Sequence, residues 1–148
     1  ILGELLEADL KGKSVLDMGC GTSILAILAS MRGAGKVTAI DIDDWCVNNS
    51  RDNIALNGIS NITVELGDAS LLNGREPFDV VIANINRNIL TADMPAYAAA
   101  LEPGGDLVMS GFLEQDVPAI VACAGELGLR PVATAAREGW MMVHVRKG

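Results

Sequence analysis

Short apolar runs alternate along the chain with longer segments in which apolar residues recur at helical spacing. A short, uninterrupted apolar run is typical of a strand that is buried on both faces of a parallel sheet. Such runs predict strands at residues 15–16, 37–40, 62–66, 78–83 and 107–109. Two late segments, at about 130–135 and 140–145, predict a closing hairpin with its turn at Glu138-Gly139.

Helices are expected between these strands, at residues 24–31, about 44–56, 87–101 and 115–127. Glycines at 33, 58 and 128 follow three of them and favour helix ends there. Asp43 or Asp44 can cap the second helix. Residues 1–10 also have helical spacing, already under way at Ile1. From this we expect that an N-terminal part precedes the chain.

This alternation predicts an α/β fold of the doubly wound class, with a mostly parallel sheet covered by helices on both faces. Ligands of such folds bind outside the carboxyl ends of the strands, where the strand order reverses. Candidate functional residues therefore lie directly after strands, at 17–23, 41, 68 and 84. A length of 148 residues without a linker or a repeat predicts one domain spanning 1–148.

Composition narrows the classes of partner. The formal charge of -8 and the pI near 4.5 disfavour nucleic acid and favour a basic protein or a small molecule. The three cysteines have no C-x-x-C spacing and the single histidine, His144, is distant, so neither a metal site nor a disulfide is expected. A reduced, cytoplasmic setting follows. No apolar run approaches the roughly 18 residues that span a membrane.

A glycine-rich turn joins the first strand to the first helix. Gly19 and Gly21 let the backbone approach a ligand closely, and the following helix offers free amide donors. A dinucleotide would favour glycine three positions later, where this chain has the β-branched Ile24. The turn, which also contains Asp17 and Cys20, therefore suits a ligand that lacks phosphate but carries an ammonium and a carboxylate. A tight turn without any ligand is the structural alternative.

Asp41 ends the second strand, roughly 20 residues after the glycine turn. An acid at this place can accept hydrogen bonds from both hydroxyls of a ribose. Alternatively, Asp41 belongs with Asp43 and Asp44 as a capping acid of the next helix, although only one cap is needed. Ile42 and Trp45 could flank an adenine ring, but apolar residues at this place are also ordinary core.

Asp68 and Asn84 follow the third and fourth strands. Asp68, next to Ala69, could accept the exocyclic amine of adenine or be an ordinary turn residue. We expect the Asn84 amide to be buried and to need partners. Its oxygen could accept from an amine, or the backbone could satisfy it. Asn86 is expected to cap the following helix.

Acid–base machinery is sparse in this chain. Around His144 no Ser-His-Asp set is possible, and no carboxylate pair suited to glycoside chemistry stands out. This scarcity favours a reaction that rests on proximity and alignment, such as the transfer of a methyl group from a sulfonium.

Together these motifs resemble class I methyltransferases and, more narrowly, the ribosomal protein L11 methyltransferase family. The stretch at 15–27 resembles motif I of that class, with Ser23 where the class has a third glycine. Four further segments are similar to the family's: Ile-Asp-Ile-Asp at 40–43, Asn-x-x-Leu-Asn-Gly at 53–58, Ala-Asn-Ile at 83–85, and Pro-Gly-Gly at 103–105 followed by Ser-Gly at 110–111.

The resemblance implies a seven-stranded sheet of order 3-2-1-4-5-7-6, with the seventh strand antiparallel, and S-adenosylmethionine as cofactor. It implies methylation of amino groups, on lysine side chains and the N-terminus, of a large-subunit ribosomal protein, which we expect to be basic. It also implies a separate substrate-recognition domain upstream of Ile1. The predicted cofactor-binding residues, with Asn84 also the catalytic residue, are Asp17, Gly19, Cys20, Gly21, Asp41, Ile42, Asp68, Ala69 and Asn84.

Two alternatives remain. The same fold and cofactor could act on another protein or on a small molecule. The chain could also be a non-catalytic nucleotide-binding module or an NAD-dependent oxidoreductase, and Ile24 disfavours the second of these.

Overall fold

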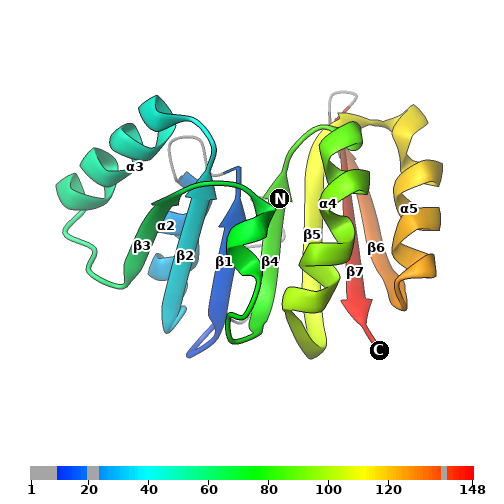
Figure 1. Cartoon of the computed structure of the whole chain (residues 1–148), viewed down its shortest axis with the longest axis horizontal. Coiled ribbons are helices and arrows are strands. Elements are labelled where there is room, and N and C mark those ends of the chain that lie inside the picture. The colour runs from blue at the N-terminus through cyan, green and yellow to red at the C-terminus, as the bar shows by residue number, and fades with distance from the viewer. Residues whose placement is uncertain (1–9, 20–23, 138–139) are drawn as a thin grey trace.

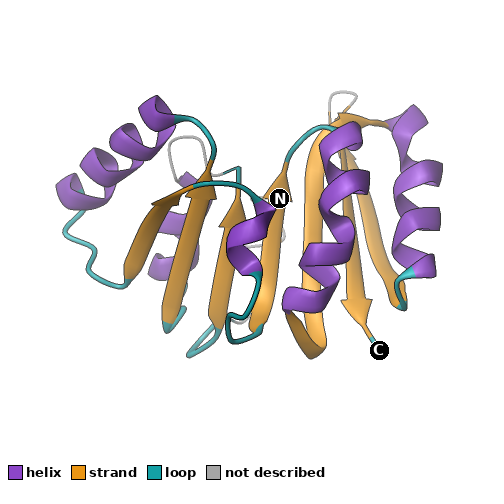
Figure 2. Ribbon diagram, in the orientation of Figure 1, coloured by secondary structure: helices purple, strands orange, loops and turns teal. Residues whose placement is uncertain are grey.

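A computed structural model describes residues 10–19, 24–137 and 140–148. Its centre is a seven-stranded sheet with the order β3-β2-β1-β4-β5-β7-β6 (Figures 1 and 2). All pairings from β3 to β5 are parallel, and β7 pairs antiparallel with both β5 and β6. This confirms the fold class and the strand order that the resemblance implied. The strands are β1 (Ser14–Met18), β2 (Lys36–Asp41), β3 (Ile62–Leu66), β4 (Phe78–Asn84), β5 (Leu101–Leu113), β6 (Leu129–Arg137) and β7 (Trp140–Lys147).

Helices cover both faces of the sheet. One face carries α4 (Arg87–Ala100), α5 (Val117–Glu126) and the short 3-10 helix η1 (Ala69–Leu72), all part of one apolar core. The other face carries α2 (Ile24–Met31) and α3 (Asp44–Leu56), which share a second core. Figure 1 shows α4 and α5 in front of the sheet and α2 behind it. Alternate residues of β1 divide between the cores, Val15 to the second and Leu16 to the first.

Local chemistry explains where two of the helices begin. The Asp43 carboxylate accepts from the Trp45 amide at 2.8 Å, so Asp43 is the N-cap of α3. Asn86 accepts from the Ile89 amide at 3.1 Å and caps α4, as predicted. Both caps stand just beyond a strand end and turn the chain back along the sheet.

The structure corrects the predicted bounds in the C-terminal half. The fifth strand is not confined to 107–109, because Leu101 pairs with Phe78 at one end and Leu113 pairs with Trp140 at the other. The helix expected from 115 begins at Val117, after a short 3-10 helix, η2 (Glu114–Asp116). There Asp116 accepts from the Leu113 amide at 3.1 Å and tightens the first turn.

Three predictions lie outside the described residues: the helix over most of 1–10, the turn at 20–23 and the hairpin tip at 138–139. Among the described segments, no helix has both the length and the apolar character needed to cross a membrane.

Candidate functional site

A cavity of about 300 Å3 lies at the carboxyl ends of β1, β2, β3 and β4. This is where a doubly wound fold binds its ligand, and the volume is at the lower end of small-molecule sites. Six of the predicted site residues line it: Gly19, Asp41, Ile42, Asp68, Ala69 and Asn84. Cys20 and Gly21 lie outside the described residues. Four strand ends that are far apart in sequence thus meet at one site.

Gly19 brings the backbone of the first turn against the cavity. Its φ of 68° is in the left-handed region that favours glycine. Its amide donates to the Ile40 carbonyl at 2.8 Å, which ties the turn to the end of β2. A Cβ at this position would lie 2.9 Å from the Ile85 side chain. A larger residue would therefore narrow the space between the ends of β1 and β4.

Asp41 remains on the cavity wall because another acid caps α3. The cap is Asp43, and Asp41 Oδ1 accepts from the Asp43 amide at 3.0 Å, which fixes the carboxylate beyond the end of β2. Ile42 also lines the cavity and is 71% exposed. Trp45 is 69% exposed on the first turn of α3 and is not among the lining residues.

Asp68 both lines the cavity and caps a helix. It lines the cavity and is the N-cap of η1, since Oδ1 accepts from the Ser70 amide at 2.9 Å and from the Ser70 hydroxyl. The Ser70 hydroxyl holds the pKa of Asp68 below its ordinary value. Asp68 is therefore an ionised acceptor at neutral pH.

Asn84 lies at the cavity mouth and is exposed, which corrects the prediction of a buried amide. The reason is its place as the last residue of β4, where the burial of the strand ends. Its backbone is held in register by pairing with Ser110, and the Ile85 amide donates to the Ser110 carbonyl at 2.9 Å. The side-chain amide is therefore presented from a fixed strand end.

Asp17 is buried beneath the site and is not among the lining residues. It is 1% exposed, and within the described part of the chain neither carboxylate oxygen has a hydrogen-bond partner. Burial, with a smaller contribution from the Asp41 charge, raises the pKa of Asp17 to about 7. The Ala26 amide at the start of α2 partly opposes this rise without reaching hydrogen-bond geometry. A buried carboxyl in this state is costly unless a cationic group pairs with it.

The sequence reasoning missed one wall of the cavity, which α4 supplies. Ile89, Asp93 and Tyr97 all line the cavity. They recur every fourth residue, so they lie along one face of the helix. That spacing after Asn84 is a signal in the sequence, but it does not reveal which way the helix faces.

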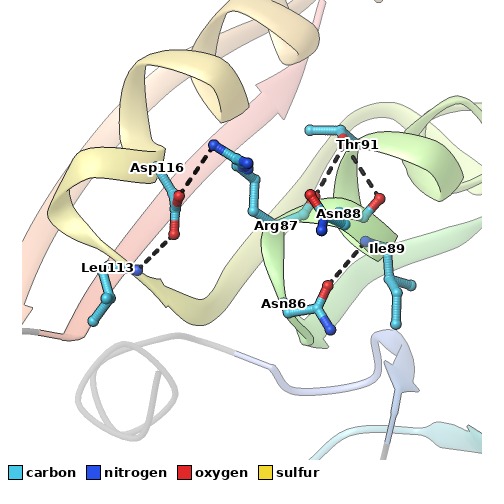
Figure 3. A network of polar contacts seen from close by, with 7 residues as sticks. All are labelled: Asn86, Arg87, Asn88, Ile89, Thr91, Leu113 and Asp116. Carbon is cyan, nitrogen blue, oxygen red and sulfur yellow. Dashed lines mark hydrogen bonds and ion pairs between the residues drawn. The ribbon is translucent and has the colours of Figure 1, made fainter.

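A polar network surrounds the first turn of α4 (Figure 3). Arg87, the first residue of α4, forms an ion pair with Asp116 at 3.3 Å. The second Asp116 oxygen accepts from the Leu113 amide, so the pair connects the segments that follow β4 and β5. Because Arg87 is half exposed, we expect this ion pair to add less than about 1 kcal/mol to the free energy of unfolding.

Among the residues that the structure describes, the remaining titratable side chains form no second reactive centre. His144 lies in β7 and contacts Asp106 at 2.8 Å, as expected for a structural residue of the closing strand. Cys46 and Cys123 are both unbridged thiols. Across 10–19, 24–137 and 140–148, no group of acidic, cysteine and histidine side chains has the arrangement of a metal site.

The comparisons with known proteins agree with this geometry. Residues 2–148 match the family model described as "Ribosomal protein L11 methyltransferase (PrmA)". This chain belongs to the ribosomal protein L11 methyltransferase family. A family member from Phocaeicola vulgatus is 70% identical over 143 residues, and one from Bacteroides fragilis is 60% identical over the same length. Both alignments cover 97% of this chain and 51% of the relative.

A solved structure supports the same assignment. The ribosomal protein L11 methylase from Lactobacillus delbrueckii subsp. bulgaricus superimposes with a TM-score of 0.92 at 30% identity. The match covers 99% of this chain and 77% of that chain. This chain therefore spans about half the length of the curated relatives it matches.

Proposed function

We propose that this chain is the S-adenosylmethionine-binding domain, residues 1–148, of an enzyme that methylates amino groups of a large-subunit ribosomal protein. The observation that carries the proposal is the meeting of Gly19, Asp41 and Asn84 around one cavity at the strand ends. Membership in the family supports both the cofactor and the substrate class. The absence of an acid–base set among the described residues fits a displacement that relies on alignment.

The residues present fit each part of this cofactor. The Asp41 carboxylate, fixed at the end of β2, would accept from the ribose hydroxyls. Ile42 and Ala69 supply apolar surface for the adenine, and Asp68 supplies an acceptor. Buried Asp17, which has no partner in the described part of the chain, would gain one from the ammonium group of the ligand. Gly19 has no side chain between its backbone and Ile85, so the carboxylate end of the ligand would meet the backbone of this turn.

When bound, the cofactor would supply a methyl group on a sulfonium sulfur: the acceptor amine would bond to the methyl carbon as the carbon–sulfur bond breaks, and S-adenosylhomocysteine would leave as a thioether. A lysine amine has an ordinary pKa of about 10.4 and must be neutral to attack. Asn84 would position that amine, because its amide oxygen can accept an N–H while the nitrogen lone pair points at the methyl carbon. The partly apolar surroundings of Ile85 and Ile89 favour the neutral form.

We also propose that the substrate is a basic ribosomal protein and that the reaction takes place in the cytoplasm. The net charge of -8 supports a basic partner. The runner-up, a different protein or a small molecule as acceptor, predicts no binding of the ribosomal protein. A dinucleotide site predicts tight NADH binding in a fluorescence titration, and Ile24 disfavours it.

Isothermal titration with S-adenosylhomocysteine tests the proposal. We expect micromolar binding by the wild-type chain, weakened at least about tenfold by Asp41→Ala through loss of a charge-assisted hydrogen bond. The matched control is Asp44→Ala, which removes the same charge from an exposed position outside the cavity. No binding by the wild type would refute the proposed function. An equal loss in both variants would remove Asp41 from the site.

A further inference from the structure

The α4 wall of the cavity contains a fully buried hydroxyl without a use in the fold. Tyr97 is 0% exposed, and its hydroxyl has no hydrogen-bond partner within the described part of the chain. An unsatisfied buried hydroxyl costs about 1–3 kcal/mol. Tyr97 nevertheless lines the cavity, so a bound ligand could supply the missing partner. Burial raises the pKa of Tyr97 well above its ordinary value, which keeps the phenol protonated and able to donate.

Two carboxyl groups belong to the same end of the cavity. Asp93 lies one helical turn before Tyr97 on α4, and Asp68 stands at the start of η1, against which α4 packs. Burial raises the pKa of Asp93, and the Asp68 charge adds to the rise, so the two carboxyl groups lie near one another. Asp41 is the last residue of β2, whereas Asp93 and Tyr97 lie on α4, so Asp41 and the Asp93–Tyr97 pair stand on different walls of the cavity.

The polar groups at the α4 end have a definite hydrogen-bonding pattern. Two carboxyl groups offer acceptors, and one phenol offers a donor. A 6-aminopurine has the complementary edge, because its exocyclic amine donates two hydrogens and the adjacent ring nitrogen N1 accepts one. A 6-oxopurine has the reverse pattern at both positions. With the ribose at Asp41, the base would extend from the end of β2, past Asp68, toward the α4 wall.

We propose that Asp93 and Tyr97 form an adenine-reading subsite, in which the Tyr97 hydroxyl donates to ring nitrogen N1 and the Asp93 carboxylate, with Asp68, accepts the 6-amino group. This inference rests on the proposed function and deepens it, because it assigns the base specificity of the site to α4. Asp93 and Tyr97 are specificity-determining residues, and the methyl transfer itself needs neither of them.

Calorimetric titration with S-adenosylhomocysteine and with S-inosylhomocysteine, its 6-oxo analogue, tests this subsite. We expect the wild type to prefer the adenosyl ligand by roughly 100-fold, since a site built for one pattern leaves polar groups unpaired with the other. Tyr97→Phe should lower the affinity for S-adenosylhomocysteine by about fivefold. The melting temperature of this variant should equal that of the wild type or exceed it. Asp93→Asn should lower the preference at least about tenfold, because a carboxamide can donate to the 6-oxygen.

A matched control is Asp52→Asn, the same chemical change at an exposed position of α3, which should leave both affinities unchanged. The subsite would be overturned if Tyr97→Phe and Asp93→Asn both had the wild-type affinity for S-adenosylhomocysteine and the wild-type preference for it over S-inosylhomocysteine. That result would leave the proposed function standing. Failure of the wild type to bind S-adenosylhomocysteine would overturn both. A lower melting temperature of Tyr97→Phe with unchanged binding would show that the hydroxyl is structural and also overturn the subsite.

Discussion

Asp17 makes the stability of the protein depend on pH. Its pKa is about 7 in the folded state against an ordinary value of 3.8. The folded state therefore disfavours the ionised form, and stability is lost as the pH rises from about 4 to 7 and is level above that. Each pKa unit corresponds to about 1.4 kcal/mol, so the loss reaches a few kcal/mol.

Asp17→Asn removes this titration. We expect the variant to gain stability relative to wild type as the pH rises, measured by urea unfolding at pH 4.5 and pH 8. At pH 8 the same variant should bind S-adenosylhomocysteine more weakly, because the ammonium group loses its anionic partner. The exposed Asp52→Asn serves as control and should show neither effect. A stability difference that is the same at both pH values would mean that Asp17 does not titrate in this range.

At the scale of elements, Gly111 controls how closely β5 approaches the end of β4. Its φ is 95°, and a Cβ would lie 2.9 Å from the backbone nitrogen and oxygen of Ile85. Gly111→Ala therefore adds a backbone clash to a left-handed strain of about 1–2 kcal/mol. The displaced residue follows Asn84 directly, so we expect a loss of S-adenosylhomocysteine affinity as well as of stability.

Gly58→Ala is the matched comparison. Gly58 has a φ of 64°, but a Cβ there would meet no atom within 4 Å. Thermal unfolding should show the smaller loss for this variant, with unchanged ligand affinity. Equal losses of stability in the two variants would show that the backbone of Ile85 yields to the extra atom without cost.

The strand ends of the site could be predicted from sequence, whereas the α4 wall could not. Asp41 and Asp68 follow apolar runs, and in a parallel sheet every such position arrives at one edge. Ile89, Asp93 and Tyr97 are separated by regular helical spacing, but their contribution depends on how α4 rotates against η1. The exposure of Asn84 was also missed, because the pattern does not reveal where the covering helices stop. The full length of β5 was missed for a similar reason, because it depends on pairing with β4 and β7, which the apolar run at 107–109 does not reveal.

At the scale of the whole molecule, the sequence pattern was sufficient for the class of fold but the family resemblance was needed for the strand order. Alternation of strands and helices predicts a doubly wound sheet without choosing among its orders. The two late strands were expected to form a closing hairpin, and only the resemblance gave their order in the sheet. In the structure β7 lies between β5 and β6 and pairs with β5 as far as Leu113. On its other side β5 pairs with β4, and this pairing places Ser110 beside Asn84 at the end of β4.

The net charge of -8 leads to a prediction about association with the proposed substrate. Attraction between an acidic and a basic protein acts over about 10 Å at 0.1 M salt and about 3 Å at 1 M. We therefore expect the affinity for a purified basic large-subunit ribosomal protein to fall at least about tenfold between 50 and 500 mM potassium chloride. S-adenosylhomocysteine, which binds by short-range contacts, should lose less than about twofold over the same range and serves as the internal control. An affinity for the ribosomal protein that does not respond to salt would mean that recognition rests on apolar contacts, with no role for the acidic surface.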